Sequence, residues 1–207
     1  MIERPPLILR LIMRGALFRM PQAPGERTVY LTFDDGPIPQ ATPWVLGCLR
    51  EHGAKATFFM VADNARRYPQ LVEQVVSEGH AVGNHTMHHI QGLRTPTAAY
   101  LADAKEALQY LPAGAATLFR PPHGLMRPSQ RRALLRAGRI VLYDVLTRDY
   151  APAVTAADIE RTVRRLVRPG SIIVLHDSLR SIHKLRTALP RLLSHLTAEG
   201  YTFGLLN

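Results

Sequence analysis

The sequence predicts a parallel α/β sheet or barrel folded as a single domain. Short runs rich in β-branched and aromatic residues alternate with longer amphipathic runs, a pattern typical of repeated strand–helix units. The chain has 207 residues, a length that suits one globular domain with a substantial core. No Gly/Ser-rich linker, charge block or internal repeat interrupts the alternation.

Seven strands and six helices are expected. The strands are predicted at 29–33, 56–62, 81–84, 117–120, 139–145, 171–176 and 201–206. The helices are predicted between them, at 42–52, 68–79, 97–111, 128–137, 155–168 and 183–198. Thr95-Pro96 and Thr155 are typical of helix starts. Glycine is favoured just past helix ends, and here those glycines are Gly53, Gly79, Gly138 and Gly200.

Residues 1–27 are expected to form a basic, apolar segment ahead of a domain that spans 28–207. Arginines interrupt the segment, so no run reaches the ~18–20 apolar residues of a membrane-spanning helix. No clear cleavage site for a signal peptide follows. Its apolar side chains suit either a helix packed on the domain or a peripheral membrane contact through residues 1–20; they are Leu7, Ile8, Leu11, Ile12 and Leu17. A cell-envelope and a cytoplasmic location both stay open.

Composition restricts the partners. The formal charge is +10, and all but three of the 26 basic residues are arginine. Such a charge suits nucleic acid, an anionic membrane surface or an anionic glycan. No aromatic-and-basic motif for nucleic acid accompanies it, so an arginine bias is the simpler explanation and nucleic acid is not expected. Cys48 is the single cysteine, which excludes an intrachain disulfide and leaves the redox compartment open.

Polar residues follow the predicted strands. They are Asp34-Asp35, Asn84-His85, Arg120, Asp149 and His176-Asp177. In a barrel of parallel strands the chemistry lies on the loops at the carboxyl ends of the strands. Charged residues placed by chance would fall equally often on helix exteriors. This coincidence predicts a functional site at one end of the barrel.

Two of these clusters have the chemistry of a metal site. Asp34 and Asp35 are adjacent carboxylates, which repel each other unless they share a cation or a proton. His85 and His89 are four residues apart, close enough on one helical turn to bind a single ion, with His88 pointing away. Two histidines and one carboxylate leave coordination positions open, as a catalytic metal needs. Such a set suits Zn²⁺, and also Co²⁺, Mn²⁺ or Fe²⁺.

The remaining clusters suit proton transfer. His176 ends the most apolar strand, and an imidazole with an ordinary pKa of ~6.5 is a natural proton donor. Arg120 could hold the aspartate that does not bind metal. Asp149 could orient the His176 imidazole. Structural ion pairing accounts for Arg120 or Asp149 individually about as well.

Five motifs in fixed order resemble the polysaccharide deacetylases with a NodB homology domain, also called carbohydrate esterase family 4. They are TFDDGP at 32–37, HTMHH at 85–89, RPPHG at 120–124, DY at 149–150 and LHD at 175–177. The first two in this order are very specific, and the last two are weak alone. The resemblance covers the chain from about residue 28 to its end. It implies a distorted (β/α) barrel with fewer than eight repeats, which fits the seven predicted strands.

Carried over residue by residue, the resemblance implies a metal-assisted hydrolase. Its implied metal ligands are Asp35, His85 and His89. Asp34 would be the general base and His176 the general acid, with Arg120 and Asp149 supporting them.

The resemblance also implies how the acetyl group is held. The backbone N–H of His123 would bind the oxyanion, Leu175 would line the pocket for the acetyl methyl, and Tyr150 would form an aromatic wall. Relatives usually carry tyrosine at the His123 position and tryptophan at the Tyr150 position. Tyr143 also stands where relatives often have tryptophan. These departures put the role of the usual tyrosine side chain in doubt but remove no essential group.

The expected activity is removal of N-acetyl or O-acetyl groups from an acetylated glycan or amino sugar. A metal-dependent amidohydrolase acting on a small or lipid-linked amide is an alternative, since fold does not fix substrate. A catalytically inactive glycan-binding domain is a second alternative. An iron oxygenase shares the ligand set, but the dedicated acid and base argue against it. Oligomeric state cannot be read from the sequence.

Overall fold

The computed structural model describes residues 3–206, and its centre is a sheet of eight strands. The strands are β1 (Thr28–Asp34), β2 (Ala56–Met60), β3 (Ala81–Asn84), β4 (Leu118–Phe119), β5 (Arg139–Ile140), β6 (Val145–Leu146), β7 (Ile172–His176) and β8 (Thr202–Phe203). Their order is β5-β4-β3-β2-β1-β7-β6, with β8 paired to β1, and every pairing is parallel. The predicted barrel of parallel strands in a single domain is confirmed.

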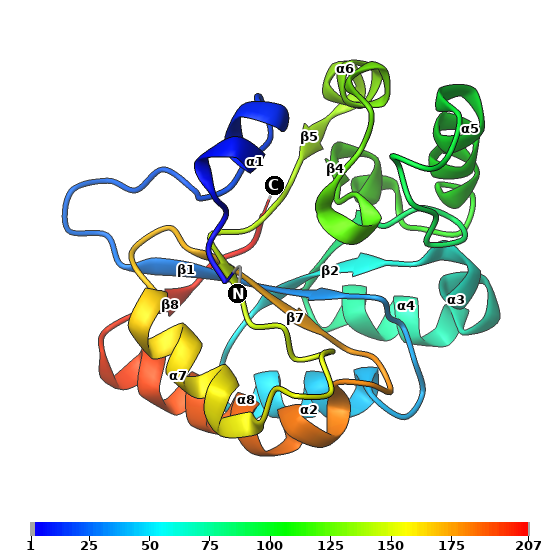
Figure 1. Ribbon diagram of the computed structural model, residues 1–207. Helices are drawn as coiled ribbons and strands as arrows, with labels where there is room; N and C mark the ends of the chain where they lie inside the picture. Colours follow the sequence, from blue (N-terminus) through cyan, green and yellow to red (C-terminus); the bar gives the residue numbers. More distant parts are fainter. Residues whose placement is uncertain (1–2, 207) are drawn as a thin grey trace.

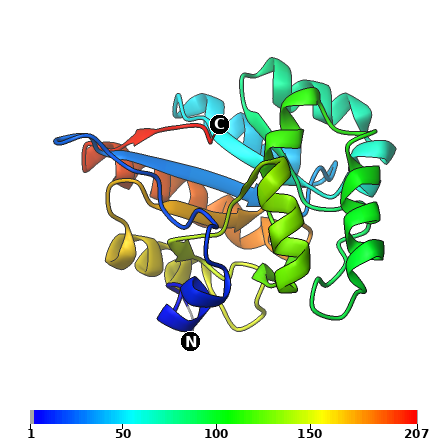
Figure 2. The same cartoon turned by 90° about the horizontal axis from the view of Figure 1, so that it is seen from above.

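Helices surround the sheet (Figure 1). They are α1 (Leu7–Ile12), α2 (Thr42–Glu51), α3 (Ala62–Arg67), α4 (Pro69–Ser77), α5 (Thr97–Ala107), α6 (Pro128–Ala137), α7 (Ala156–Leu166) and α8 (Ile182–Ala198), with 3₁₀ turns η1 (Ala113–Thr117) and η2 (Pro122–Gly124). The helices α2, α7 and α8 cover one side, and α5 and α6 stand beyond β4 and β5 (Figures 1 and 2). Within residues 3–206, no helix is long and apolar enough to cross a membrane.

Alternation along the strands separates an outer core from an inner one. Leu31 and Phe33 of β1 face the helices and belong to the largest buried cluster, together with residues of α2 and α8. Tyr30 of β1 and Ile172 of β7 point the other way, into a second cluster inside the barrel. Because side chains alternate at every residue, the inward row that begins at Tyr30 ends at Asp34. The sheet therefore delivers polar side chains to its carboxyl edge.

The expected strand at 139–145 is in fact two short strands. After β5 the backbone N–H of Leu142 donates to Leu17 O, and that of Asp144 donates to Ile172 O. The chain thus crosses from β4 to β7 at this point. Residues 17–19 lie between the two strands, where Leu17 pairs with Val141 and Arg19 pairs with Ser171. Arg168 and Ser171 hold the buried Asp144 carboxylate at the bend, at 2.7 and 2.9 Å.

Further predicted boundaries were wrong. The helix predicted at 97–111 ends at Ala107, and the strand predicted at 201–206 covers only Thr202–Phe203. The strand predicted at 56–62 ends at Met60, because Ala62 begins helix α3 and its N–H donates to Thr86 O. Near the N-terminus the helix covers only Leu7–Ile12, and Leu17 pairs with Val141 in a bridge instead of extending the helical face. The division between residues 27 and 28 stays a prediction.

Candidate active site

The inward rows of β1 and β7 end side by side at a cavity. Asp34 and His176 are register partners at the carboxyl ends of these two strands. The cavity has a volume of about 780 Å³ and is lined by residues of all the predicted motifs. A pocket of this size at the carboxyl edge of a parallel barrel is where such folds place their chemistry.

Three side chains at the floor of the cavity form a group that could hold a metal ion. One ligand atom each from Asp35, His85 and His89 lies within 4.8 Å of the other two. Asp35 Oδ1 is 3.2 Å from His89 Nε2 and 3.8 Å from His85 Nε2. The predicted set is therefore brought together. The reason differs from the prediction, because residues 85–89 form a turn and no helix.

The turn closes through strained backbone. Thr86 and His89 have φ of 70° and 54°, the left-handed region that non-glycine residues rarely adopt. Asp35, His123 and Arg148 also have positive φ, so four of the five such residues other than glycine in the described chain line this cavity, and the fifth, Thr86, follows the lining residue His85. Strain of this kind costs on the order of 1–3 kcal/mol per residue and collects at functional sites. Its placement is independent support for a function here.

His85 could hold a cation through Nε2. Its Nδ1 lies 2.7 Å from the carbonyl oxygen of Arg120, which can only accept, so Nδ1 carries the proton. Burial lowers the pKa of His85 to about 4, which keeps the imidazole neutral at physiological pH. Nε2 thus presents a free lone pair towards Asp35. A fixed tautomer of this kind is the usual support for a metal-binding histidine.

Asp35 remains a carboxylate. Burial raises its pKa, but the hydrogen bond from His89 and the charges of the nearby imidazoles outweigh that effect and hold the pKa well below its ordinary value. The Asn64 side-chain amide donates to Asp35 O at 2.8 Å and fixes the strained backbone. A negative oxygen and two imidazoles therefore face a common point.

Asp34 is held by a buried arginine. Arg120 Nη1 donates to Asp34 Oδ1 at 2.6 Å, and both side chains are buried. The guanidinium also donates to Thr32 Oγ1 and Leu142 O, at 2.8 and 3.0 Å, and lies over the Phe59 ring. Burial lowers the pKa of Arg120, and the Asp34 carboxylate opposes that shift. Asp34 is thereby oriented by one strong charge-assisted bond.

His176 is paired with Asp149. Asp149 Oδ1 lies 2.7 Å from His176 Nδ1, and its Oδ2 accepts from the His176 backbone N–H at 2.8 Å. Burial lowers the pKa of His176, but the Asp149 carboxylate reverses the shift and raises the pKa to about 9. The imidazole is therefore protonated at neutral pH, with Nε2–H left free. Lys184 Nζ in turn donates to Asp149 O and Ala151 O, at 2.8 and 2.7 Å.

Asp177 holds the Asp35-Gly36 turn through a hydrogen bond to its backbone. Gly36 N–H donates to Asp177 Oδ1 at 3.1 Å, and Thr42 Oγ1 donates to Oδ2 at 2.5 Å. This contact brings the Gly36 backbone directly against the carboxylate. The next bond, Gly36–Pro37, is cis.

Gly36→Ala should destabilise the protein by about 2–3 kcal/mol, because the added Cβ would overlap the buried Asp177 carboxylate. Urea unfolding monitored by circular dichroism measures the change. Gly114→Ala is the matched control, since a Cβ there meets no atom within 4 Å, and it should change stability by less than about 0.5 kcal/mol. Equal stability of the two variants would contradict the proposed contact.

The aromatic and histidine positions that depart from the family lie at the cavity wall. His123 lines the cavity with its ring centroid 5.0 Å from that of His89. Burial lowers the pKa of His123, with His89 as a second cause. Tyr150 packs edge-on against His176 at 4.9 Å, and Tyr143 lines the same wall.

One predicted residue does not reach the cavity. Leu175 is fully buried in the outer core beneath the helices, on the opposite face of β7 from its neighbours. Val174 and His176, one residue to each side, line the cavity instead. The expectation that Leu175 lines the pocket was wrong because a strand alternates its side chains at every residue.

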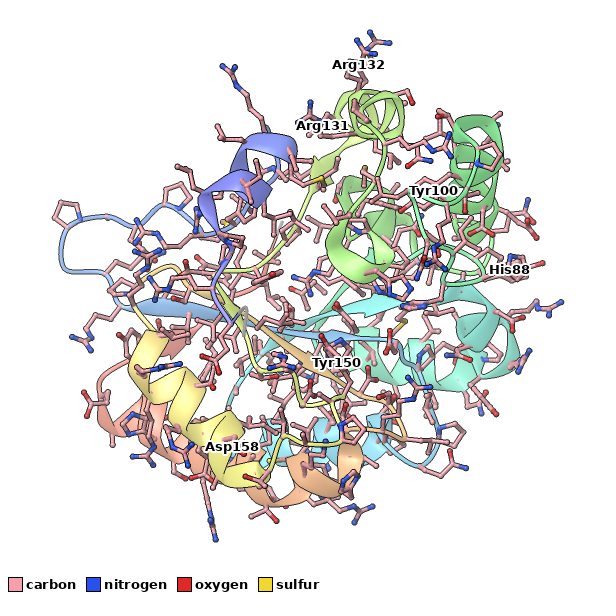
Figure 3. All side chains as sticks on the ribbon, in the orientation of Figure 1. His88, Tyr100, Arg131, Arg132, Tyr150 and Asp158 are labelled. Atoms are coloured by element: carbon pink, nitrogen blue, oxygen red, sulfur yellow. The ribbon has the colours of Figure 1, made fainter. Side chains whose placement is uncertain are left out.

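His88 lies away from the ligand group. Its Nδ1 is 2.7 Å from Asp103 Oδ2 on α5, and the side chain reaches the surface (Figure 3). Asp103 Oδ1 also accepts from the Met87 backbone N–H, at 2.8 Å. Asp103 therefore stabilises the 85–89 turn from the side opposite the candidate ligands His85 and His89.

Sequence reasoning missed several residues around the site. Asp103, Thr42 and Lys184 support the turns, and the apolar residues Ile8 and Ile12 of α1 form part of the cavity wall. Lys184 carried a weak signal, as one of three lysines in an arginine-rich chain. The other four sit in ordinary helical or turn patterns, which gave no signal.

The fold is a parallel barrel whose carboxyl edge carries a buried Asp–Arg pair, a buried His–Asp pair and a candidate cation site. The family model for polysaccharide deacetylase matches residues 22–141. The chain belongs to the polysaccharide deacetylase family, carbohydrate esterase family 4, and is an enzyme of the type that hydrolyses amide bonds.

Named relatives and a solved structure agree with this assignment. A peptidoglycan-N-acetylglucosamine deacetylase of Bacillus cereus is 34% identical over 183 residues, which are 86% of this chain and 85% of that protein. A chitooligosaccharide deacetylase of Azorhizobium caulinodans is 37% identical over 73% of this chain and 74% of its own. A crystal structure of a peptidoglycan N-acetylglucosamine deacetylase superposes with a TM-score of 0.86 at 29% identity, covering 98% of this chain and 95% of that one.

Proposed function

We propose that the chain removes N-acetyl groups from an acetylated glycan with the help of one divalent metal ion. The observation that carries the proposal is the placement of two buried proton-transfer groups, Asp34 and His176, beside the donor set of Asp35, His85 and His89. Each proton-transfer group has its own buried, oppositely charged partner. Arg120 orients the Asp34 carboxylate, and Asp149 raises the pKa of the His176 imidazole.

The donor set fits a divalent ion. It offers one carboxylate oxygen and two imidazole nitrogens, with His85 Nε2 freed by the bond from Nδ1 to Arg120 O. Three protein ligands of this kind suit Zn²⁺ and leave a position for the reactants, although Co²⁺, Mn²⁺ and Fe²⁺ accept the same ligands. When bound, such an ion would act as a Lewis acid towards the acetyl carbonyl and the attacking water.

The protein's own residues would divide the proton transfers. Asp34 would take a proton from the attacking water, and Arg120 holds this carboxylate in place. His176 would give the proton on Nε2 to the departing nitrogen, while Asp149 holds the imidazole through Nδ1. The His123 backbone N–H would support the oxyanion. A protonated acid suits an amine leaving group especially, and this supports N-acetyl over O-acetyl substrates.

Relatives suggest the class of glycan. The names of the similar proteins refer to peptidoglycan and to chitooligosaccharides, both of which contain N-acetylglucosamine. Tyr143 and Tyr150 give the cavity an aromatic wall, against which a sugar ring can pack. We infer that an N-acetylglucosamine-containing glycan is the substrate.

Acetate release tests the proposal. The purified chain, with its metal content measured on the same sample, would be given acetylated chitooligosaccharides, peptidoglycan fragments, O-acetylated xylan and small N-acetylated amides. Acetate release and a matching mass loss are expected on the first two. Bound glycan without turnover would favour an inactive binding domain, and activity confined to small amides would favour the amidohydrolase alternative.

His123→Tyr should change kcat/KM by less than about tenfold, roughly 1.4 kcal/mol of barrier, because the proposed oxyanion donor is the backbone N–H. His176→Ala is the comparison and should cost at least the ~10²-fold typical of a general acid. The measurement is kcat/KM against pH for both variants. A loss at His123 as large as that at His176 would mean that the His123 imidazole itself takes part in proton transfer or substrate binding.

A further inference from the structure

Helix α1 exposes an unusual apolar face. Leu7, Ile8, Leu11 and Ile12 have exposed fractions of 72, 62, 62 and 47%. We call these four residues the α1 apolar face. They account for four of the six residues of the helix. A contiguous exposed patch of large aliphatic side chains on a folded protein is typical of an interaction surface.

The α1 apolar face is held in a fixed position. Beneath it, Met13 is fully buried and Leu9 packs against the same cluster as Leu134 and Leu135. Arg131 Nη1 of α6 donates to Ile12 O at 2.6 Å and to Arg14 O at 3.0 Å. The face therefore stays exposed while the rest of the helix is bound to the barrel.

Arginines outnumber acidic residues in the segments around the α1 apolar face, where Asp144 pairs with Arg10 at 3.6 Å and Glu3 bonds to Arg165. Residues 4–25 and 107–143 contain no Asp or Glu. Arg14, directly after α1, is exposed, and so are Arg132 and Arg136 on α6, the helix whose Arg131 bonds to Ile12 O and Arg14 O. Arg132 projects outwards from α6, and Arg131 lies on the side of α6 that faces α1 (Figure 3). The surface is thus apolar at its centre and cationic at its edge.

We propose that this surface docks onto a membrane that contains anionic lipids. Aliphatic side chains that enter the interface and arginines that contact lipid phosphates are the two components of peripheral membrane binding. A second copy of this chain is a poorer occupant, because pairing two such surfaces would bring their arginines together. Charge complementarity therefore favours an anionic bilayer.

Membrane docking would place the candidate active site at the bilayer surface. Ile8 and Ile12 belong both to the α1 apolar face and to the wall of the cavity that contains Asp34 and His176. The mouth of the cavity is therefore continuous with the docking surface. A bound molecule would reach glycan attached to, or lying close to, the membrane.

Co-sedimentation of the full chain with vesicles tests the proposal. Binding is expected to phosphatidylcholine vesicles that contain about a third phosphatidylglycerol, and it should weaken in 0.5 M NaCl and with phosphatidylcholine alone. Leu11→Gln should lower the partition coefficient about fivefold or more, because it removes an apolar side chain that does not line the cavity. Val76→Gln on α4 is the control, 45% exposed, and should change it less than twofold.

A second pair of variants tests whether the arginines of this surface contribute to vesicle binding. Arg132→Gln with Arg136→Gln should weaken binding about fivefold or more. Arg66→Gln with Arg67→Gln on α3 removes the same charge from another surface and should have less than half that effect. Thermal unfolding checks that all variants fold. Equal binding to neutral vesicles, equal losses in the control variants, or a dimer that Leu11→Gln dissociates in the absence of vesicle binding would each overturn the proposal.

Discussion

Replacing His89 by alanine should remove bound metal and turnover together. His89 Nε2 lies 3.2 Å from Asp35 Oδ1 and is one of three candidate ligands, so its loss leaves two. Two ligands hold a divalent ion far more weakly than three, and structural support residues alone change metal affinity by about 10–100-fold. We therefore expect metal content close to zero after dialysis against a weak chelator, and kcat/KM reduced by at least about 10³-fold.

His88→Ala is the matched control for this result. The His88 imidazole is next in the chain but faces Asp103, 2.7 Å away, and its side chain is half exposed. This variant should keep its metal and its activity, with a modest loss of stability from the broken contact to α5. Elemental analysis and acetate release on the same two samples separate the cases. An inactive His88→Ala protein beside a metal-replete His89→Ala protein would reverse the assignment.

The sequence predicted the edge of the fold that carries the site because strand positions alone determine it. Asp34 and His176 follow apolar strands, and parallel strands bring their carboxyl ends to one edge. The contact of Arg120 with Asp34 was implied by the family resemblance, and orientation of His176 was one of the roles considered for Asp149. These contacts join residues far apart in sequence, so the regular order of strands was needed to bring them together.

Local geometry was less predictable. The His85–His89 spacing suggested a helical turn, but Thr86 and His89 adopt left-handed backbone conformations. Neither residue is a glycine, so the sequence contained no sign of these conformations. Tertiary contacts that hold the turn, including the Met87 N–H bond to Asp103, offset the energetic cost of that conformation. The prediction for Leu175 failed for a simpler reason. His176 faces the cavity, and adjacent residues of a strand point to opposite faces, so Leu175 cannot face the cavity as well.

The surface of α1 could be recognised only in part. The apolar residues and arginines between 4 and 20 favoured either packing on the domain or a peripheral membrane contact. The structure packs the segment on the domain through Met13 and leaves Leu7 and Leu11 exposed. Sequence periodicity does not distinguish a buried apolar stripe from an exposed one, since both repeat every three to four residues.

Asp34→Asn should abolish turnover while leaving the metal bound. Asp34 is absent from the group of ligand atoms that lie within 4.8 Å of one another, so its carboxylate is not needed to hold the ion. An amide cannot accept the proton of the attacking water, and loss of a general base costs about 10²–10⁴-fold. Asp35→Asn should instead weaken metal binding itself, because it removes the one anionic ligand of the set.

Stability must be measured beside activity, because Asp34 also neutralises a buried arginine. Removing one partner of a buried ion pair costs up to about 3–5 kcal/mol. Two features should reduce that cost in Asp34→Asn. The asparagine oxygen can still accept from Arg120 Nη1, and the guanidinium keeps its bonds to Thr32 and to Leu142 O. We therefore expect a folded, metal-replete and inactive protein, destabilised by about 1–3 kcal/mol in urea. Equal metal loss in the Asp34 and Asp35 variants would instead mean that both carboxylates bind the ion.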